Sequence, residues 1–303
     1  MRSPLLDRLL PRELHTTDRP SETAQWTTLA RALELRRPKD QRIVSDPYAP
    51  LFLTQPNQRI LRTLRHGSAL LTIAERNEFA ALSTFSLCRH RFIDEQLRLA
   101  LAEGVEQVVI LGAGYDSRAY RFADELAGRP VHEVDLAPLS RRKAGIVAAN
   151  PHLFAGTAIR RVEIDFRVDA LAERLLAAGF AVGVRTFVVW EGVSMYLTGA
   201  AVGTTLDTLA DICGPGSVLT MDLFHDISGL RPIDRLRRAG VRAIRLIGEP
   251  ITFALTPKQA PGFLHTHGFE ASTVMQSDAL AAHYSTDRRP CDRSVYVLAA
   301  RRR

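Results

Sequence analysis

A continuous apolar run at residues 108–111 leads directly into the turn Gly112-Ala113-Gly114, and this junction limits the folds open to the chain. Four apolar residues in a row are typical of a parallel strand that is buried on both faces. The two glycines permit the backbone angles of a tight turn and remove Cβ atoms that would hold a ligand away from the backbone. We therefore expect a strand whose carboxyl end carries a ligand-binding turn.

The residues after the turn predict a helix and a second strand. Apolar side chains recur at helical spacing from Arg118 to Leu126, and Gly128 and Pro130 end that pattern. The next apolar run ends in Asp135, whose carboxylate can accept hydrogen bonds from both hydroxyls of a ribose. Strand, glycine turn, helix, strand and acid make up half of a mononucleotide-binding fold.

The turn also distinguishes between two classes of ligand. A dinucleotide site has the pattern G-x-G-x-x-G, in which the third glycine permits close helix packing beside a pyrophosphate. Here Ser117 stands at the third position, and Asp116 would repel a pyrophosphate but suits the ammonium of an amino-acid moiety. The turn therefore favours S-adenosylmethionine over NAD. A plain tight turn without a ligand is the alternative that this stretch alone leaves open.

Further along the chain, short apolar runs alternate with helical patterns. The predicted strands are 159–166, 186–190, 217–224, 268–275 and 294–300, and the helices between them are 138–149, 168–178 and 200–213. This alternation predicts an α/β fold, a Rossmann-like, doubly wound and mostly parallel sheet. We expect residues 1–104 to form a helical N-terminal cap and residues 105–303 the core, with the glycine- and proline-rich stretch 225–262 as an inserted lid.

Acids stand at the ends of three predicted strands. Asp135, Asp165 and Glu191 each follow an apolar run, at the sheet edge where open α/β folds bind ligands. A single acid there is equally compatible with a helix cap or a surface position. Three in succession beside a glycine turn indicate a crevice that binds a cation or many hydroxyl and amino donors.

Composition excludes several classes of protein. The three cysteines lie far apart in the sequence and form no disulfide framework or CxxC metal site, which suits a reducing compartment. Since HxE spacing is absent too, we expect no metal. No apolar run reaches the roughly 18 residues of a membrane helix, and residues 1–14 carry acids and a proline where a signal peptide is apolar. We expect a cytoplasmic protein without a membrane partner.

The net charge of +7 raises the question of nucleic-acid binding. A phosphate-binding surface combines a basic stripe with stacking aromatic residues. The arginines are spread along the chain, and their one cluster, Arg231–Arg245, has no interleaved aromatic residues. We therefore expect no nucleic-acid partner. The cluster could instead meet an acidic substrate or an acidic carrier protein.

A set of ordered motifs resembles one known family. The motifs are SETA at 21–24 (an S-x-T-A pattern), DPYA at 46–49, RHRFID at 89–94, VVILGAGYDSRAYR at 108–121, EVD at 133–135 with Lys143, DFR at 165–167 and EGVSMYL at 191–197. Together they resemble the leucine carboxyl methyltransferase family, closest to its bacterial S-adenosylmethionine-dependent branch, which includes O-methyltransferases of aromatic polyketide pathways. The resemblance runs from about residue 21 to about residue 224. It implies a Rossmann-like fold of the class I methyltransferase type.

The resemblance also implies roles for single residues in cofactor binding. Arg89 would pair with the carboxylate of the methionine moiety, for which a bidentate guanidinium is suited. Gly112 and Gly114 would pass under the cofactor, Asp135 would hold its ribose, and Glu191 would meet its ammonium.

Further positions follow from the same resemblance. Asp165 would accept a hydrogen bond from the adenine amine, and Phe166 would contribute apolar contact or its backbone amide. Tyr196 would lie towards the methyl acceptor. His90 stands where the family has a small residue, so Arg91 is the alternative to its neighbour as the carboxylate contact.

The predicted reaction is methyl transfer to an oxygen. A carboxylate acceptor needs no base, whereas a hydroxyl would benefit from a histidine. His225, after the fifth strand, is the preferred candidate, ahead of His265 and His267. The expected function is S-adenosylmethionine-dependent O-methylation of a small metabolite or a peptide terminus, in secondary metabolism. A nicotinamide-dependent oxidoreductase and a non-catalytic adenosylmethionine-binding protein are the alternatives.

Overall fold

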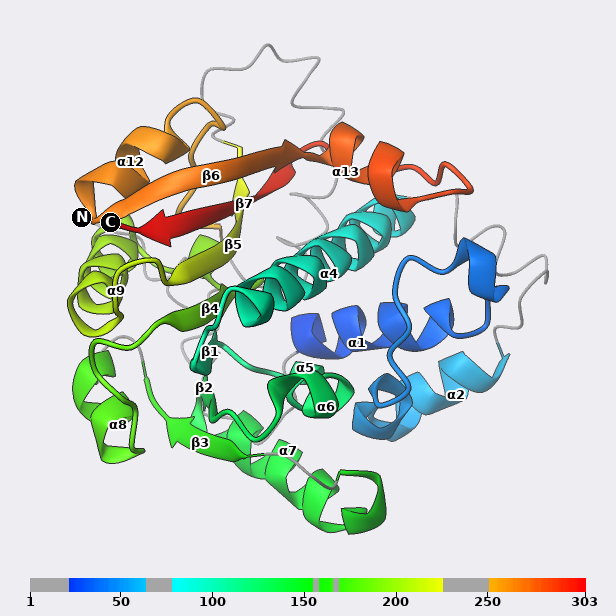
Figure 1. Ribbon diagram of the computed structural model, residues 1–303. Coiled ribbons are helices and arrows are strands. Elements are labelled where there is room, and N and C mark those ends of the chain that lie inside the picture. The colour runs from blue at the N-terminus through cyan, green and yellow to red at the C-terminus, as the bar shows by residue number, and fades with distance from the viewer. Residues whose placement is uncertain (1–21, 64–77, 155–157, 166–168, 226–250) are drawn as a thin grey trace, which may run out of the picture.

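The computed structural model describes residues 22–63, 78–154, 158–165, 169–225 and 251–303. These residues form one seven-stranded sheet of order β3-β2-β1-β4-β5-β7-β6 (Figure 1). The strands are β1 (Gln107–Leu111), β2 (Val131–Asp135), β3 (Ile159–Glu163), β4 (Thr186–Trp190), β5 (Val218–Phe224), β6 (Phe269–Gln276) and β7 (Val295–Arg302). β1 to β5 are parallel, and β7 is antiparallel to both β5 and β6. The predicted doubly wound fold is confirmed.

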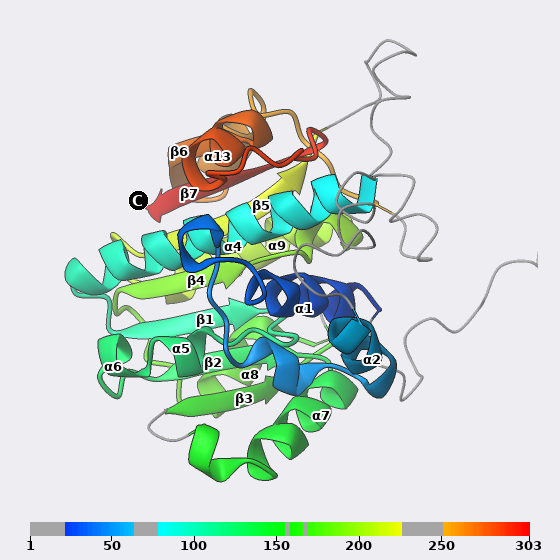
Figure 2. The same cartoon turned by 90° about the vertical axis from the view of Figure 1, so that its right-hand side faces the viewer.

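One helical layer covers the first face of the sheet and reaches over its ligand-binding edge. It comprises α1 (Glu22–Glu34), α2 (Gln55–Thr63), α4 (Glu78–Ala102), α5 (Arg118–Arg121), α6 (Ala123–Leu126), α7 (Ala137–Ala148) and α13 (Ser277–Tyr284). The longest of these, α4, lies over the sheet and runs roughly along the direction of its strands (Figure 2). One hydrophobic core joins its apolar side chains, such as Phe85 and Phe92, to Val108 and Val189 of the strands. The boundary predicted at residue 104 therefore lies inside one core.

A second helical layer covers the opposite face of the sheet. It consists of α8 (Leu171–Ala177), α9 (Gly199–Ile212) and α12 (Ala260–Thr266). Their apolar side chains share a core with Val109, Leu111 and Trp190, which alternate with the residues facing α4. Burial on both faces explains why β1 and β4 consist of apolar runs rather than alternating patterns.

Several elements differ from the prediction. The helix expected at 118–126 is interrupted at Phe122, and β3 ends at Glu163 rather than at residue 166. Helix α13 was not predicted, because Ser277 follows β6 without a glycine or proline to mark a new element. This helix is too short to be stable alone, and its packing against α4 stabilises it.

The predicted lid at 225–262 is only partly described. Residues 226–250 lie outside the described residues, and so does the Arg231–Arg245 cluster. At the end of that range the backbone amides of Thr252 and Phe253 donate to Met195 O, at 2.8 and 3.2 Å. α12 then begins at Ala260, so the described end of the segment packs against the core domain. No helix among the described residues has the length and apolarity needed to cross a membrane.

Candidate active site

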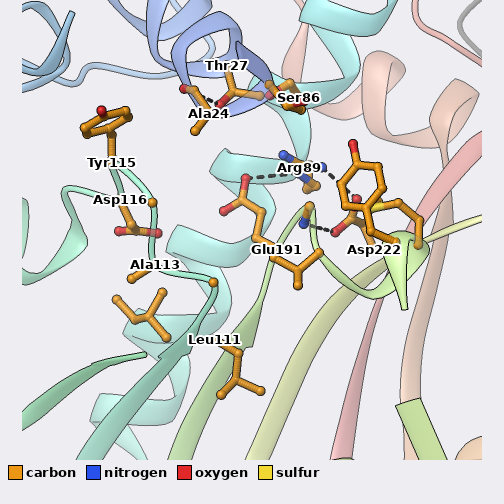
Figure 3. A pocket seen from close by; sticks show the side chains of 18 of the residues that line it. Ala24, Thr27, Ser86, Arg89, Leu111, Ala113, Tyr115, Asp116, Glu191 and Asp222 are labelled. Atoms are coloured by element: carbon orange, nitrogen blue, oxygen red, sulfur yellow. Dashed lines mark hydrogen bonds and ion pairs between the residues drawn. The ribbon is translucent and has the colours of Figure 1, made fainter. Parts of the chain in front are cut away.

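A pocket opens at the carboxyl ends of β1, β2 and β4, and residues of α1 and α4 cover it (Figure 3). Its volume of about 360 Å³ lies within the range of small-molecule sites. Seven of the residues predicted from the sequence line it: Arg89, Gly112, Gly114, Asp135, Asp165, Glu191 and Tyr196. The remaining cofactor residue predicted, Phe166, lies outside the described residues. The sheet topology thus brings residues from five separate segments to one place.

The glycine turn and the acid that ends β2 are directly connected. Asp135 Oδ2 accepts a hydrogen bond from Gly114 N at 2.5 Å, and its Oδ1 accepts one from Leu136 N at 2.7 Å. Burial raises the pKa of Asp135, while these two amides and Lys143 oppose the rise. Each oxygen keeps a further lone pair, so the carboxylate is held in place and can still accept from a ligand.

Glycine is favoured at the two positions of the turn for different structural reasons. At Gly114, with φ of +46°, an added Cβ would meet no atom nearer than 3.8 Å, so that side of the backbone is open. At Gly112, with φ of +65°, a Cβ would lie 2.2 Å from Val193 Cγ2. The space on the Cβ side of Gly112 is therefore taken by a protein side chain. The role of Gly112 beside the cofactor stays a prediction.

Glu191 lies at the end of β4 and receives two guanidinium groups. Arg89 Nε donates to its Oε1 at 2.9 Å, and Arg118 Nη1 donates to its Oε2 at 2.7 Å. Burial would raise the pKa of Glu191, but Arg118 and Arg89 together hold it well below its usual range. The carboxylate therefore stays ionised inside the pocket.

Arg89 lies between two acids (Figure 3). Besides Glu191, its Nη1 donates to Asp222 Oδ2 at 2.6 Å, and Asp222 Oδ1 accepts from Gly192 N at 2.6 Å. Within the described part of the chain, its remaining nitrogen, Nη2, has no hydrogen-bond acceptor. Arg91 points to the surface and pairs with Glu95 at 2.9 Å. Of the two candidate arginines, only Arg89 lines the pocket.

A network of buried charges supports this arrangement from behind. Arg118 Nε donates to Asp94 Oδ1 at 2.8 Å, and its Nη1 also contacts Asp116 Oδ2. Arg121 donates to both oxygens of Asp94, at 2.6 and 2.9 Å. The ring nitrogens of His90 lie 2.8 Å from Arg118 Nη2 and 2.7 Å from Arg121 Nη2. Burial first, and Arg118 second, lower the pKa of His90, so its imidazole is neutral.

The sequence interpretation missed two residues of this assembly, Arg118 and Asp222. Asp222 is a fully buried acid within the mostly apolar strand β5, and a buried carboxylate requires a nearby cation or donor. That requirement is a signal that the sequence carried. Arg118 had no comparable signal, because it stands among the exposed-looking residues of a helix start.

The predicted base His225 is not among the residues that line the pocket. Its backbone amide donates to Ser294 O at 2.8 Å, and its ring packs edge-on against Tyr296, with 5.1 Å between centroids. His265 pairs with Glu270 at 3.0 Å, and His267 with Asp207 at 2.6 Å, both away from the pocket. Tyr196, from the short helix η4 (Ser194–Tyr196), does line it.

No group of three or more histidine, cysteine or acidic side chains within the described part of the chain is placed to hold a metal ion. The acids at the pocket face arginines and backbone amides instead, as Glu191 and Asp135 do. The charges of this site are therefore suited to a ligand with both an ammonium and a carboxylate.

Solved structures share this fold over most of their length. A DUF574 family protein from Streptomyces avermitilis MA-4680 gives a TM-score of 0.57 at 16% identity, covering 90% of this chain and 97% of that chain. A "putative methyltransferase" from Thermobifida fusca YX gives 0.55 at 18% identity, covering 89% and 97%. Strand order and these likenesses together define the fold class, a Rossmann-like doubly wound sheet.

The chain belongs to the leucine carboxyl methyltransferase family, whose sequence profile matches residues 24–210. A "Putative S-adenosyl-L-methionine-dependent methyltransferase" of Rhodococcus jostii (strain RHA1) is 35% identical over 216 residues, 71% of this chain and 69% of that protein. A relative of the same name from Mycobacterium avium (strain 104) is 33% identical over 225 residues, 74% and 73%. The chain is therefore an S-adenosylmethionine-dependent methyltransferase, as the motifs predicted.

Proposed function

We propose that this methyltransferase transfers the methyl group of S-adenosylmethionine to an oxygen, either a carboxylate or a hydroxyl, of a small metabolite in secondary metabolism. When bound, the cofactor supplies a methyl group on a sulfonium, which is already activated for transfer. The protein then has to orient both reactants in line and exclude water. A carboxylate acceptor loses no proton, whereas a hydroxyl must release one.

The unpaired nitrogen of Arg89 is the observation that carries this proposal. Two of its three guanidinium nitrogens are fixed by Glu191 and Asp222, and Nη2 is left facing the pocket without an acceptor. A carboxylate in the pocket would complete the bonding of this guanidinium with a charge-assisted hydrogen bond. We assign this position to the methionine carboxylate of the cofactor.

The other cofactor contacts follow from the same placement. Glu191 would receive the ammonium, since each of its oxygens keeps a lone pair beside the arginine bonds. Asp135 would accept from the ribose, and the open side of Gly114 would lie under the cofactor. Asp165, which lines the pocket beyond Asp135, would contact the adenine. Tyr196 would lie towards the acceptor.

The acceptor itself is proposed as a small molecule or a peptide terminus. An acidic carrier protein meeting the Arg231–Arg245 cluster remains a proposal drawn from the sequence, since that segment lies outside the described residues. The catalytic role predicted for His225 likewise stays a prediction.

Calorimetric titration with S-adenosylmethionine and its demethylated product tests the cofactor assignment. We expect both to bind the unmodified protein, and Asp135→Ala to weaken both by about 10- to 100-fold, because a carboxylate bonded to ribose hydroxyls contributes roughly 1.5–3 kcal/mol. Asp278→Ala, at an exposed acid of α13, is the control and should bind as the unmodified protein does. If NADH gives a heat of binding, and S-adenosylmethionine and its demethylated product give none, the proposal is contradicted and an oxidoreductase is favoured.

A further inference from the structure

The pocket extends beyond the groups assigned to the cofactor. From Arg89 it continues along α4 towards the start of that helix, past Ser86 and Phe85 to Leu82. These residues recur at intervals of three and four, so they share one face of the helix. The opposite wall includes Trp26 of α1 and Phe224 at the end of β5. We call this part of the pocket the acceptor subsite.

Ser86 is the exception in this mostly apolar subsite. The residue is 5% exposed and lines the pocket, and among the described residues its hydroxyl makes no hydrogen bond. Thr84, two residues earlier on α4, shows the usual arrangement, because its hydroxyl donates to Ala80 O at 3.0 Å. The nearest hydroxyl from the facing helix, that of Thr27, is already bonded to Ala24 O at 3.1 Å (Figure 3). The hydroxyl of Ser86 is therefore free to donate a hydrogen bond to a ligand in the pocket or to accept one from it.

Charge constrains what that ligand can be. Two arginines line the described part of the pocket, and each has other partners for all but one nitrogen; the unbonded nitrogen of Arg31, Nε, is buried. Arg31 lies 3.4 Å from a carboxylate oxygen of Asp46 and donates to Tyr115 O at 2.8 Å. Arg89 has only Nη2 left, and the cofactor carboxylate would occupy it. A carboxylate in the acceptor subsite would then face Glu191 without a cation of its own, which is costly at a buried position.

We propose that the methyl acceptor is an uncharged hydroxyl compound with an apolar body, and that Ser86 selects it by a hydrogen bond. This inference rests on the proposed function and narrows it. In the transfer step the acceptor oxygen forms a bond to the methyl carbon. The S–CH₃ bond breaks with its electron pair remaining on sulfur, and the hydroxyl proton passes to solvent water. Ser86 is a specificity-determining residue, and it holds the hydroxyl while Phe85 and Trp26 contact the apolar body.

A matched pair of probes tests this inference. Protein saturated with S-adenosylhomocysteine is titrated at pH 7 with 2-naphthol, which is neutral, and with 2-naphthoate, which has the same ring system and carries a charge. We expect naphthol to bind at least about tenfold more tightly, because the acid meets an unpaired buried charge. Ser86→Ala should weaken naphthol binding about fivefold, the effect of one neutral hydrogen bond, and leave the affinity for S-adenosylhomocysteine unchanged.

Two further variants distinguish the loss of the Ser86 hydrogen bond from general damage to the fold. Thr84→Ala removes a hydroxyl from the same helix outside the pocket and should leave both affinities unchanged. Ser86→Thr retains a hydroxyl and should restore most of the naphthol affinity. Loss of S-adenosylhomocysteine binding in Ser86→Ala alone would place Ser86 at the cofactor and overturn the inference.

The failure of this inference is separable from the failure of the proposed function. Suppose that S-adenosylhomocysteine binds, but naphthoate binds as tightly as naphthol or more tightly, or neither probe binds. The inference of a hydroxyl acceptor is then wrong, and the assignment of the cofactor site stands. If S-adenosylhomocysteine itself does not bind the unmodified protein, the proposed function falls, and this inference falls with it.

Discussion

Arg118 Nη1 donates to Glu191 Oε2 across 2.7 Å, although the two residues are 73 positions apart in the chain. This bond joins the helix after the glycine turn to the end of β4, and both side chains are largely buried. Because Arg118 also contacts Asp94 and Asp116, one guanidinium joins three acids from three segments. The shape of the pocket therefore depends on a residue that is not among those lining it.

The first prediction concerns that guanidinium. Arg118→Met keeps most of the side-chain volume but leaves Asp94, Asp116 and Glu191 without their shared cation. We expect the free energy of unfolding to fall by about 3–5 kcal/mol, as when one member of a buried ion pair is removed. Urea denaturation followed by circular dichroism measures it.

Arg141→Met is the matched control for this variant. Arg141 pairs with Glu163 at 2.8 Å, but its side chain is 74% exposed. Solvent screens such pairs, so the urea midpoint should not move. Equal losses in the two variants would show that the buried network is not a special source of stability.

The second prediction tests the free nitrogen of Arg89. Arg89→Lys retains the positive charge but cannot bond Glu191, Asp222 and a third carboxylate in the same planar geometry. S-adenosylhomocysteine affinity should fall by about 10- to 100-fold. Methylthioadenosine, which lacks the amino-acid moiety, should bind the variant and the parent equally in calorimetry. A similar loss for both ligands would indicate general damage to the pocket.

The third prediction concerns packing at the glycine turn. Gly112→Ala would place a Cβ 2.2 Å from Val193 Cγ2 at a φ of +65°, so clash and backbone strain act together. We expect a loss of about 2–3 kcal/mol of unfolding free energy. Combining it with Val193→Ala removes the clash and leaves only the strain, roughly 1–2 kcal/mol. Thermal denaturation of the two single variants and the double variant gives the coupling free energy between the two positions. Strictly additive losses of stability would refute the predicted clash.

The fourth prediction follows from His132 on β2. The residue is fully buried, its ring nitrogens have no hydrogen-bond partner, and burial lowers its pKa from 6.5 to about 4. The unfolded chain binds a proton at His132 below about pH 6.5, whereas the folded protein does not until about pH 4. The stability due to neutral His132 is therefore complete above pH 6.5 and is lost as the pH falls towards 4.

His132→Leu should flatten this acid dependence, measured as melting temperature from pH 7 to pH 4.5. An apolar residue also suits the site, where the ring contacts Phe180 at a centroid distance of 5.6 Å. His283→Leu, at an exposed position on α13, should retain the parent's acid dependence. If His132→Leu loses stability with acid as steeply as the parent, another group is responsible.

The parts of the fold that the sequence predicted are those determined locally. β1, its glycine turn and Asp135 lie within one short stretch, and burial on both faces leaves a continuous apolar pattern. Helix α13 could not be predicted with equal ease, since its packing partner α4 is nearly 200 positions away and its own eight residues carry no strong signal.

The site shows the same division. Asp135 and Glu191 were predicted from their places at strand ends and Arg89 from the resemblance, whereas Asp222 and Arg118 depend on pairing between distant segments. Which neighbour occupies the space beside Gly112 was equally invisible, because Val193 reaches it only after β1 and β4 pair. Local patterns determine the elements, and long-range pairing determines which charges meet.

The sheet order has a consequence for synthesis of the protein on the ribosome. β6 emerges before β7, but it joins the sheet only through β7, which lies between β5 and β6. The strands β1 to β5 can pair in the order in which they are made or soon afterwards. The exposed edge of β5 must instead wait for the strand ending at Arg302. During translation this edge is open to pairing with other chains, so the nascent protein is most prone to aggregation just before β7 is released.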